Sequence, residues 1–100
     1  MRAMLSVVIP TLNAEETLTR TLAPLVPAAV RGLVQEVIVV DGGSSDRTLE
    51  IVEAAGAKLV TAPKGRGTQM AAGAKAARGN WLLFLHGDTV LEPGWVAEVE

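Results

Sequence analysis

The stretch Trp81-Leu82-Leu83-Phe84-Leu85-His86-Gly87-Asp88-Thr89 decides the fold of this chain. Five large apolar residues follow one another without a break and stop at a histidine, a glycine and an aspartate. An apolar run of this length, closed by a glycine, is typical of a strand that is buried on both faces. Ligands of open parallel sheets bind beyond the carboxyl ends of the strands, so we expect His86 and Asp88 to stand at a ligand crevice.

Three further strands are predicted upstream of this one. They cover residues 5–9, which Pro10 ends because it cannot donate in a central ladder, residues 36–41, and residues 58–61. Each run is rich in β-branched residues and is followed by a turn. The sequence therefore predicts four strands in all.

Helices are predicted between these strands. The first begins at Asn13, an N-cap with Glu16 at capping-box spacing, and is weakened by the prolines at 24 and 27. The second begins at Asp46 as N-cap and stops at Gly56. The third covers residues 65–78 with Gly79 as its C′ residue, and a fourth starts near Pro93.

The alternation of strands and helices predicts one α/β domain over residues 1–100, a parallel sheet with helices on both faces. The order 3-2-1-4 is the most economical, and it places the switch point between the first and fourth strands. Gly73 costs the third helix about 1 kcal/mol relative to alanine, which a close approach of helix to sheet would explain.

Composition excludes several classes of protein. No apolar run reaches the ~18 residues of a membrane span, and the first residues lack a signal-peptide pattern. The chain has no cysteine, which excludes disulfides and thiolate metal sites and favours a cytoplasmic location.

Charge is unevenly distributed, although the net charge is only −2. No acidic residue lies between Ala54 and Gly87, a segment that could face an anionic ligand through its basic residues, Lys58, Lys64, Arg66, Lys75 and Arg78. For Lys75 and Arg78 a solvated helix face is the simpler interpretation. No aromatic residues are interleaved with these charges, so we expect no nucleic acid partner.

Polar residues gather after three of the strands, at residues 11–13, 41–44 and 86–88. Asp41 can accept hydrogen bonds from a base or a ribose, and Asp88 is a hard oxygen donor suited to Mg²⁺ or Mn²⁺. Each has a structural alternative. Asp41 precedes two glycines and could be an ordinary turn former, and a lone histidine such as His86 is more often structural than a ligand.

Several phosphate and hydrolase motifs are absent. The segment Gly65-Arg66-Gly67 lacks the third glycine of a dinucleotide fingerprint, which would fall at Met70. The chain contains neither a P-loop nor a Gly-x-Ser-x-Gly nucleophile elbow.

Three segments, residues 7–13, 39–48 and 82–89, together resemble the family 2 glycosyltransferases. The resemblance follows all four strands in order. It implies the nucleotide-binding half of a glycosyltransferase A-type fold, with the acceptor half and the catalytic base lying outside these 100 residues. Gly42 stands where many members have a second acid.

The resemblance also implies a site and a cofactor. Asp88 matches the last acid of the Asp-x-Asp motif that holds Mn²⁺ or Mg²⁺ against the diphosphate, and His86 replaces the first acid, as in a bacterial subgroup with His-x-Asp. The implied metal ligands are therefore Asp88 and His86. The residues implied to bind the nucleoside-diphosphate sugar are Pro10, Thr11, Asn13, Glu15, Asp41, Gly43, Ser44, Arg66, Gly67, Gln69, His86 and Asp88.

Two other functions stay open at this point. A nucleotidyltransferase is disfavoured because the glycine-rich basic loop after the first strand is absent. A non-catalytic nucleotide-binding or interaction module would leave the fourth strand with an apolar edge, through which the chain could associate with itself. The acceptor of a transferase is not identified by the sequence.

Overall fold

A computed structural model describes residues 5–23, 25, 34–79 and 81–85. Four parallel strands form one sheet in the order β3-β2-β1-β4, which confirms the predicted topology. The strands are β1 (Leu5–Thr11), β2 (Val34–Asp41), β3 (Lys58–Thr61) and β4 (Trp81–Phe84), and the helices are α1 (Leu18–Leu22), α3 (Thr48–Ala55) and α4 (Arg66–Ala76). The helix predicted near Pro93 lies outside the described residues.

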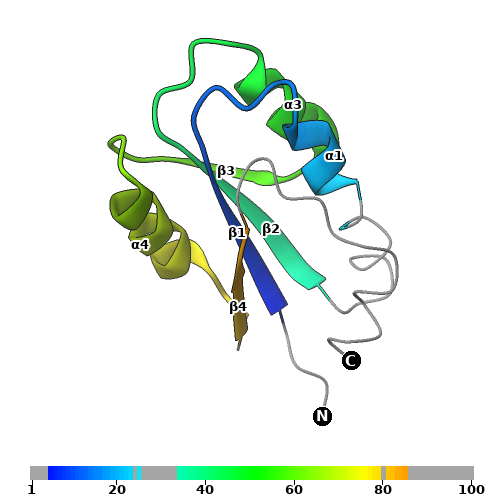
Figure 1. Cartoon of the computed structure of the whole chain (residues 1–100). Coiled ribbons are helices and arrows are strands. Elements are labelled where there is room, and N and C mark those ends of the chain that lie inside the picture. The colour runs from blue at the N-terminus through cyan, green and yellow to red at the C-terminus, as the bar shows by residue number, and fades with distance from the viewer. Residues whose placement is uncertain (1–4, 24, 26–33, 80, 86–100) are drawn as a thin grey trace.

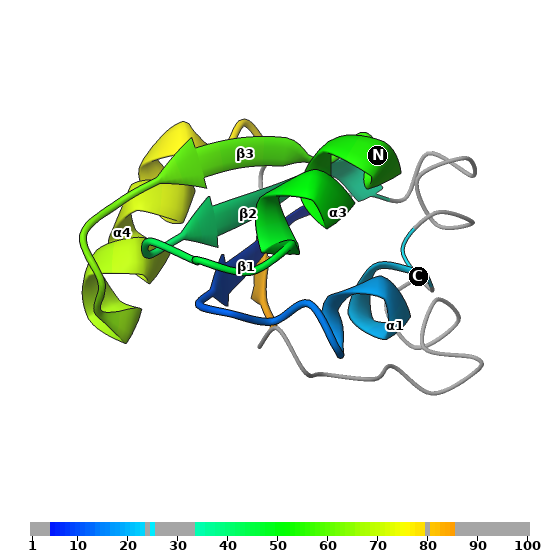
Figure 2. The same cartoon turned by 90° about the horizontal axis from the view of Figure 1, so that it is seen from above.

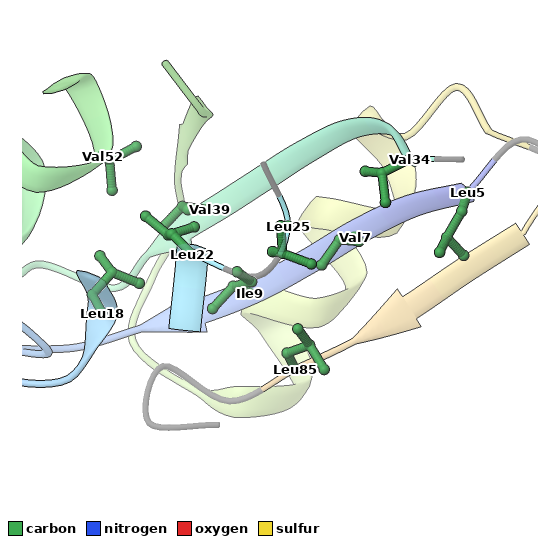
Figure 3. Packing of buried hydrophobic residues seen from close by; sticks show 10 residues of the cluster. All are labelled: Leu5, Val7, Ile9, Leu18, Leu22, Leu25, Val34, Val39, Val52 and Leu85. Carbon is green, nitrogen blue, oxygen red and sulfur yellow. The ribbon is translucent and has the colours of Figure 1, made fainter. Parts of the chain in front are cut away.

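Helices cover both faces of the sheet (Figures 1 and 2). Helices α1 and α3 lie on one face and α4 lies on the other. Alternate residues of β1 therefore enter different cores, because successive side chains of a strand point to opposite faces. Ten residues pack between the sheet and the α1–α3 face (Figure 3): Leu5, Val7, Ile9, Leu18, Leu22, Leu25, Val34, Val39, Val52 and Leu85.

The opposite core is thinner and is built around Val8, Ile38 and Val40 under the alanines of α4. Gly73 makes this thin layer possible. A methyl group added at Gly73 would lie 2.2 Å from Val8 Cγ1 and 3.0 Å from Val40 Cγ2. The predicted close approach of this helix to the sheet is confirmed.

Strand β1 continues through Pro10 to Thr11, so the prediction that Pro10 ends it was wrong. The carbonyl of Thr11 accepts from Gly42 on the β2 side, whereas the carbonyl of Val8 accepts from Leu85 on the β4 side. Backbone groups of successive strand residues point to opposite neighbours, so those of Pro10 point the same way as those of Val8. The ring nitrogen of Pro10 therefore faces the β4 side. The β4 ladder ends at the Val8–Phe84 pair, so the missing donor of Pro10 interrupts no described bond.

The first helix does not begin at Asn13, as the capping-box spacing predicted. It begins at Leu18 after Thr17, and Asn13 has a left-handed backbone with φ of 52°. The side chain of Asn13 instead bonds the loop that follows β2. The third helix was also predicted too long, since α4 ends at Ala76 with Ala77 as its C-cap, so Gly79 is not its C′ residue.

Arg78 and Gly79 are fixed by side chains of the sheet at its amino end. The N–H of Gly79 donates to Ser6 Oγ at 2.8 Å, and the N–H of Arg78 and the hydroxyl of Ser6 both donate to Glu36. Burial acts to raise the pKa of Glu36, but the hydrogen bonds from Arg78 and Ser6 outweigh it and hold that pKa below its ordinary value. This contact replaces a glycine cap at the end of the helix.

Strand β4 is less buried than its unbroken apolar run predicted. Trp81 is 63% exposed, Leu82 41% and Phe84 38%. Within the described residues β4 pairs only with β1 and lies at the edge of their sheet. An unbroken apolar run predicts that a segment is a strand, but it does not predict how many neighbouring strands pair with it. No helix among the described residues has the length and apolar content that a bilayer crossing requires.

Candidate functional site

The carboxyl ends of β1 and β2 meet at Asp41, which is only 2% exposed. Its Oδ1 accepts from the hydroxyls of Thr11, at 3.0 Å, and Ser44. Its Oδ2 accepts from the backbone N–H groups of Gly43, at 3.0 Å, and Ser44, at 2.8 Å. Four donors thus surround one buried carboxylate.

Two opposing effects set the pKa of Asp41. Burial acts to raise it, and the hydrogen bonds from Ser44, Gly43 and Thr11 act to lower it and prevail. Asp41 is therefore ionised at neutral pH, with its oxygens already used as acceptors. This geometry agrees with the interpretation of Asp41 as a turn former. A nucleotide contact at Asp41 stays a prediction, and the nucleotide would have to replace one of the four donors.

Hydrogen bonds join the loop that follows β1 to the loop that follows β2, and Figure 1 shows the two loops at the same end of the sheet. Three successive backbone N–H groups, those of Asn13, Ala14 and Glu15, donate to side-chain oxygens. Their acceptors are Ser44 Oγ at 2.8 Å, Thr48 Oγ1 at 2.9 Å and Asp46 Oδ2 at 3.2 Å. In return, Asn13 Oδ1 accepts from the N–H of Ser45 at 2.8 Å. The sequence placed these residues after neighbouring strands but did not predict this bonding.

Asp46 stands one residue before the position expected of an N-cap. Helix α3 begins at Thr48, its N-cap is Arg47, and Asp46 accepts from the N–H of Thr48 at 2.9 Å and from its hydroxyl. The bond from the Thr48 hydroxyl is the main reason why the pKa of Asp46 is lowered. Because Asp46 also holds Glu15, the cap alone does not describe its role.

A pocket of about 340 Å³ opens beside the end of β1. One wall is the end of β1 and the residues that follow, and the other is the start of α4 with the loop before it. The lining residues are Pro10, Thr11, Leu12, Lys64, Gly65, Arg66 and Gln69. Four of the predicted site residues thus share one cavity: Pro10, Thr11, Arg66 and Gln69.

Other predicted site residues do not line this pocket. Asn13, Glu15, Gly43 and Ser44 belong to the bonded loops described above, and Gly67 lies in the first turn of α4. His86 and Asp88 fall outside the described residues. Among the residues that the structure describes, no group of three or more histidines and acids could hold a metal ion.

Three residues of the pocket were absent from the predicted site, Leu12, Lys64 and Gly65. The signal for Lys64 was present in the acid-free basic segment, which was expected to face an anion. Lys64 and Arg66 are exposed side chains at the pocket, whereas Lys75 is on the last turn of α4 and does not line it. In the described residues this basic segment therefore contains side chains that line the pocket and a side chain, Lys75, that does not.

Comparison with known proteins places this geometry in a family. The family model described as glycosyl transferase family 2 matches residues 6–99. A glucosyl-3-phosphoglycerate synthase of Mycolicibacterium paratuberculosis is 34% identical over an alignment that covers 86% of this chain and 29% of the relative. The enzyme of the same name from Mycolicibacterium smegmatis is 48% identical over 56 residues, 56% of this chain and 18% of the relative.

Solved structures agree with these relatives. Glucosyl-3-phosphoglycerate synthase from Mycobacterium tuberculosis in complex with Mn²⁺, uridine diphosphate and glucosyl-3-phosphoglycerate superposes with a TM-score of 0.83 at 31% identity. The match covers 95% of this chain and 37% of that one. A complex of the same enzyme with Mg²⁺ and uridine diphosphate matches equally well.

These matches confirm the glycosyltransferase A-type sheet that the sequence implied. The chain spans 29% of the first curated relative and 37% of the solved enzyme. Since the family model extends over residues 6–99 and the strand order agrees with it, the chain belongs to glycosyl transferase family 2.

Proposed function

We propose that this chain is the donor-binding part of an inverting, metal-assisted glycosyltransferase and binds a nucleoside-diphosphate sugar. The observation that carries the proposal is the pocket at the carboxyl end of β1, with Thr11 on one wall and Arg66 on the other. Binding at the carboxyl edge is the rule for open parallel sheets. The similar enzyme from M. tuberculosis has been crystallised with uridine diphosphate, which makes this nucleotide the first ligand to test.

The charge of the pocket suits a diphosphate. Lys64 and Arg66 both line it, and none of its described lining residues is acidic. A guanidinium can hold phosphate oxygens through two parallel hydrogen bonds, and an ammonium acts as a point charge. Its volume of about 340 Å³ lies in the range of small-molecule sites, so part of a nucleotide sugar can enter it.

The bonded loops supply rigidity. A ligand in the pocket contacts the end of β1, and the residues after β1 are fixed to those after β2 through Asn13, Ser44 and Asp41. In this proposal Glu15 and Gly43 act through the same loops, and Gly67 lets the start of α4 approach the nucleotide. Prior ordering of a site lowers the entropic cost of binding.

A divalent metal fits the chain at the same edge. The N–H of Leu85 donates to the carbonyl of Val8, so the residue after β4 lies beside β1; His86 and Asp88 follow it in the sequence, outside the described residues. We propose Asp88 as the main ligand and His86 as a second, since Mg²⁺ and Mn²⁺ bind through one or two carboxylates and phosphate oxygens. Such an ion would stabilise the charge of the leaving diphosphate.

We propose that the acceptor site and the catalytic base lie outside these 100 residues, since the chain spans only 29% of the first curated relative. We therefore expect the 100 residues to bind the donor and to transfer no sugar by themselves. The cytoplasmic location and self-association through β4 remain predictions.

Isothermal titration calorimetry tests the proposal directly. Uridine diphosphate and guanosine diphosphate are titrated into the chain with Mn²⁺ and then with a chelator. We expect one of the two nucleotides to bind, more tightly when Mn²⁺ is present. The donor-binding function would be refuted if a folded sample gave no heat of binding with either nucleotide or with uridine diphosphate glucose.

A further inference from the structure

We propose that Gln69 is a positioning residue that fixes the width of the pocket, and that residue 42 must be glycine because the Gln69 amide fills the space of a side chain there. The inference rests on the proposed donor-binding function for its effect on affinity. Its geometric part stands on the described residues alone.

The side chain of Gln69 is buried, 5% exposed, and all its polar atoms are bonded to backbone. Its Nε2 donates to the carbonyl of Thr11 at 2.9 Å and to the carbonyl of Val40 at 2.8 Å. Its Oε1 accepts from the N–H of Gly65 at 3.2 Å. Both amide hydrogens are therefore used, and they face the strand ends rather than a ligand.

These three bonds join the two walls of the pocket. Thr11 belongs to the wall that β1 provides, and Gly65 belongs to the wall formed by Lys64, Gly65 and Arg66. The Gln69 amide thus links the carbonyl of Thr11 to the N–H of Gly65, which lies between the two basic residues of the pocket. A change in this amide should alter the distance between the two walls.

Gly42 leaves the space for that amide. A methyl group at Gly42 would lie 2.8 Å from Gln69 Oε1 and 3.0 Å from Gln69 Cδ. The backbone of Gly42 is itself fixed, because its N–H donates to the same Thr11 carbonyl at 3.0 Å. A side chain at 42 can enter only if Gln69 leaves its position. An aspartate or glutamate at 42 is incompatible with this position of the Gln69 amide.

The inference predicts a loss of nucleotide affinity in a chain that is still folded. In Gln69→Glu the shape is kept, but the two hydrogens that face the Thr11 and Val40 carbonyls are lost. In Gln69→Met all three bonds are lost at similar length. Gln35→Glu is the matched control, because Gln35 is exposed on β2 and away from the pocket.

Affinity for uridine diphosphate with Mn²⁺ is measured by titration, and the folded fraction is measured by circular dichroism in the same buffer. We expect both Gln69 variants to bind at least about tenfold more weakly per folded molecule, and the control to bind as the unchanged chain does. A merely structural glutamine would lower the unfolding midpoint and leave the affinity of the folded molecules intact. That result would overturn the positioning role.

A double-mutant cycle tests the pairing with residue 42. Gly42→Ala should weaken binding in the unchanged chain and have a smaller effect, or none, beside Gln69→Ala, where the methyl group meets no amide. Effects that simply add would contradict the pairing.

A measurement that needs no ligand separates this inference from the proposed function. Amide hydrogen exchange at Gly65 should be slow in the unchanged chain and faster in Gln69→Met. Fast exchange of Gly65 in the unchanged chain overturns the inference whatever binds. Slow exchange of Gly65 in a chain that binds no nucleotide supports the geometry and rejects the donor-binding function. Nucleotide binding that Gln69→Met does not affect supports the donor-binding function and rejects the positioning role of Gln69.

Discussion

The N–H of Asn13 donates to Ser44 Oγ at 2.8 Å, and the same hydroxyl donates to the Asp41 carboxylate. Ser44 thereby joins the loop after β1 to the buried acid at the end of β2. A serine fits this position because one hydroxyl can donate and accept at once. The relation makes the geometry of the first loop dependent on the ionised state of Asp41.

Asn13 contributes to this joint in two ways that substitution can separate. Asn13→Ala removes the acceptor for the Ser45 N–H and places alanine at a φ of 52°, for a combined cost of about 2–3 kcal/mol in unfolding free energy. Asn13→Gly removes only the side-chain bond, since glycine adopts positive φ freely, for a cost of about 1 kcal/mol. Urea unfolding of both variants checks this. Equal losses would show that the left-handed backbone carries no cost.

Asp41→Asn should destabilise the chain although it changes one atom. Two hydroxyls and two backbone N–H groups point at the carboxylate, and an amide nitrogen would meet donors where oxygen accepted them. We expect a loss of about 2–4 kcal/mol, because bonds to a charged group are strong and a buried donor would be left unsatisfied. Glu53→Gln on the exposed side of α3 is the control.

The pH dependence of the same variant tests the charge. The pKa of Asp41 is lower in the folded chain than its ordinary value, so the unfolded chain binds the proton more readily. This contribution is complete above the unfolded pKa of about 3.9 and is lost as pH falls through the folded pKa. Asp41→Asn should therefore show a shallower acid limb below about pH 4. Glu36 and Asp46, whose pKa values are also lowered, leave part of that limb in place.

The sequence predicted the strand order because strands and helices alternated with short connections, and it predicted which loops carry polar residues. It could not predict how those residues bond. Asn13 and Glu16 matched a capping box, but Asn13 bonds Ser45 through a contact 32 residues away. Local spacing favoured a cap, and the tertiary contact prevailed.

The location of the pocket could be predicted from the sequence, but only some of its lining residues could. Polar strand ends located it at the carboxyl edge, and the acid-free segment indicated Lys64 as a basic neighbour. The commitment of Gln69 to backbone was not predictable, since it depends on carbonyls of Thr11 and Val40 that no sequence pattern marks. In the sequence, Gly42 was noted only as a position that lacks an acid. In the structure, the Gln69 amide occupies the space that a side chain at residue 42 would need.

Gly73 and Gly67 of α4 make a matched pair for the packing of this helix. Helix propensity favours alanine by about 1 kcal/mol at either position. A methyl group meets nothing within 4 Å at Gly67, whereas at Gly73 it would lie 2.2 Å from Val8. Gly73→Ala should lower the unfolding free energy by about 1–3 kcal/mol through overpacking. Gly67→Ala should leave it unchanged or raise it, and thermal unfolding that ranks the two the other way would contradict the close packing.

Lys64 and Arg66 should contribute to nucleotide affinity because both line the pocket. Lys64→Met and Arg66→Met should each weaken uridine diphosphate binding by about 1 kcal/mol or more, with Arg66 the larger if it holds two phosphate oxygens. Lys75→Met, on the last turn of α4, removes the same charge away from the pocket and should leave affinity unchanged. If Lys75→Met weakens binding equally, the effect is that of net charge and not of the site.

Asp88 provides the sharpest test of the metal, because its loss should remove the dependence on Mn²⁺ and nothing else. In the unchanged chain Mn²⁺ should raise the affinity for uridine diphosphate, and in Asp88→Ala the nucleotide should bind with the weaker, metal-free affinity under both conditions. The expected difference is about tenfold or more, 1.4 kcal/mol per factor of ten. His86→Ala should reduce the effect of Mn²⁺ only in part, because the carboxylate would remain. Titration with and without a chelator measures both. An Asp88→Ala chain that still responds fully to Mn²⁺ would place the metal on other residues.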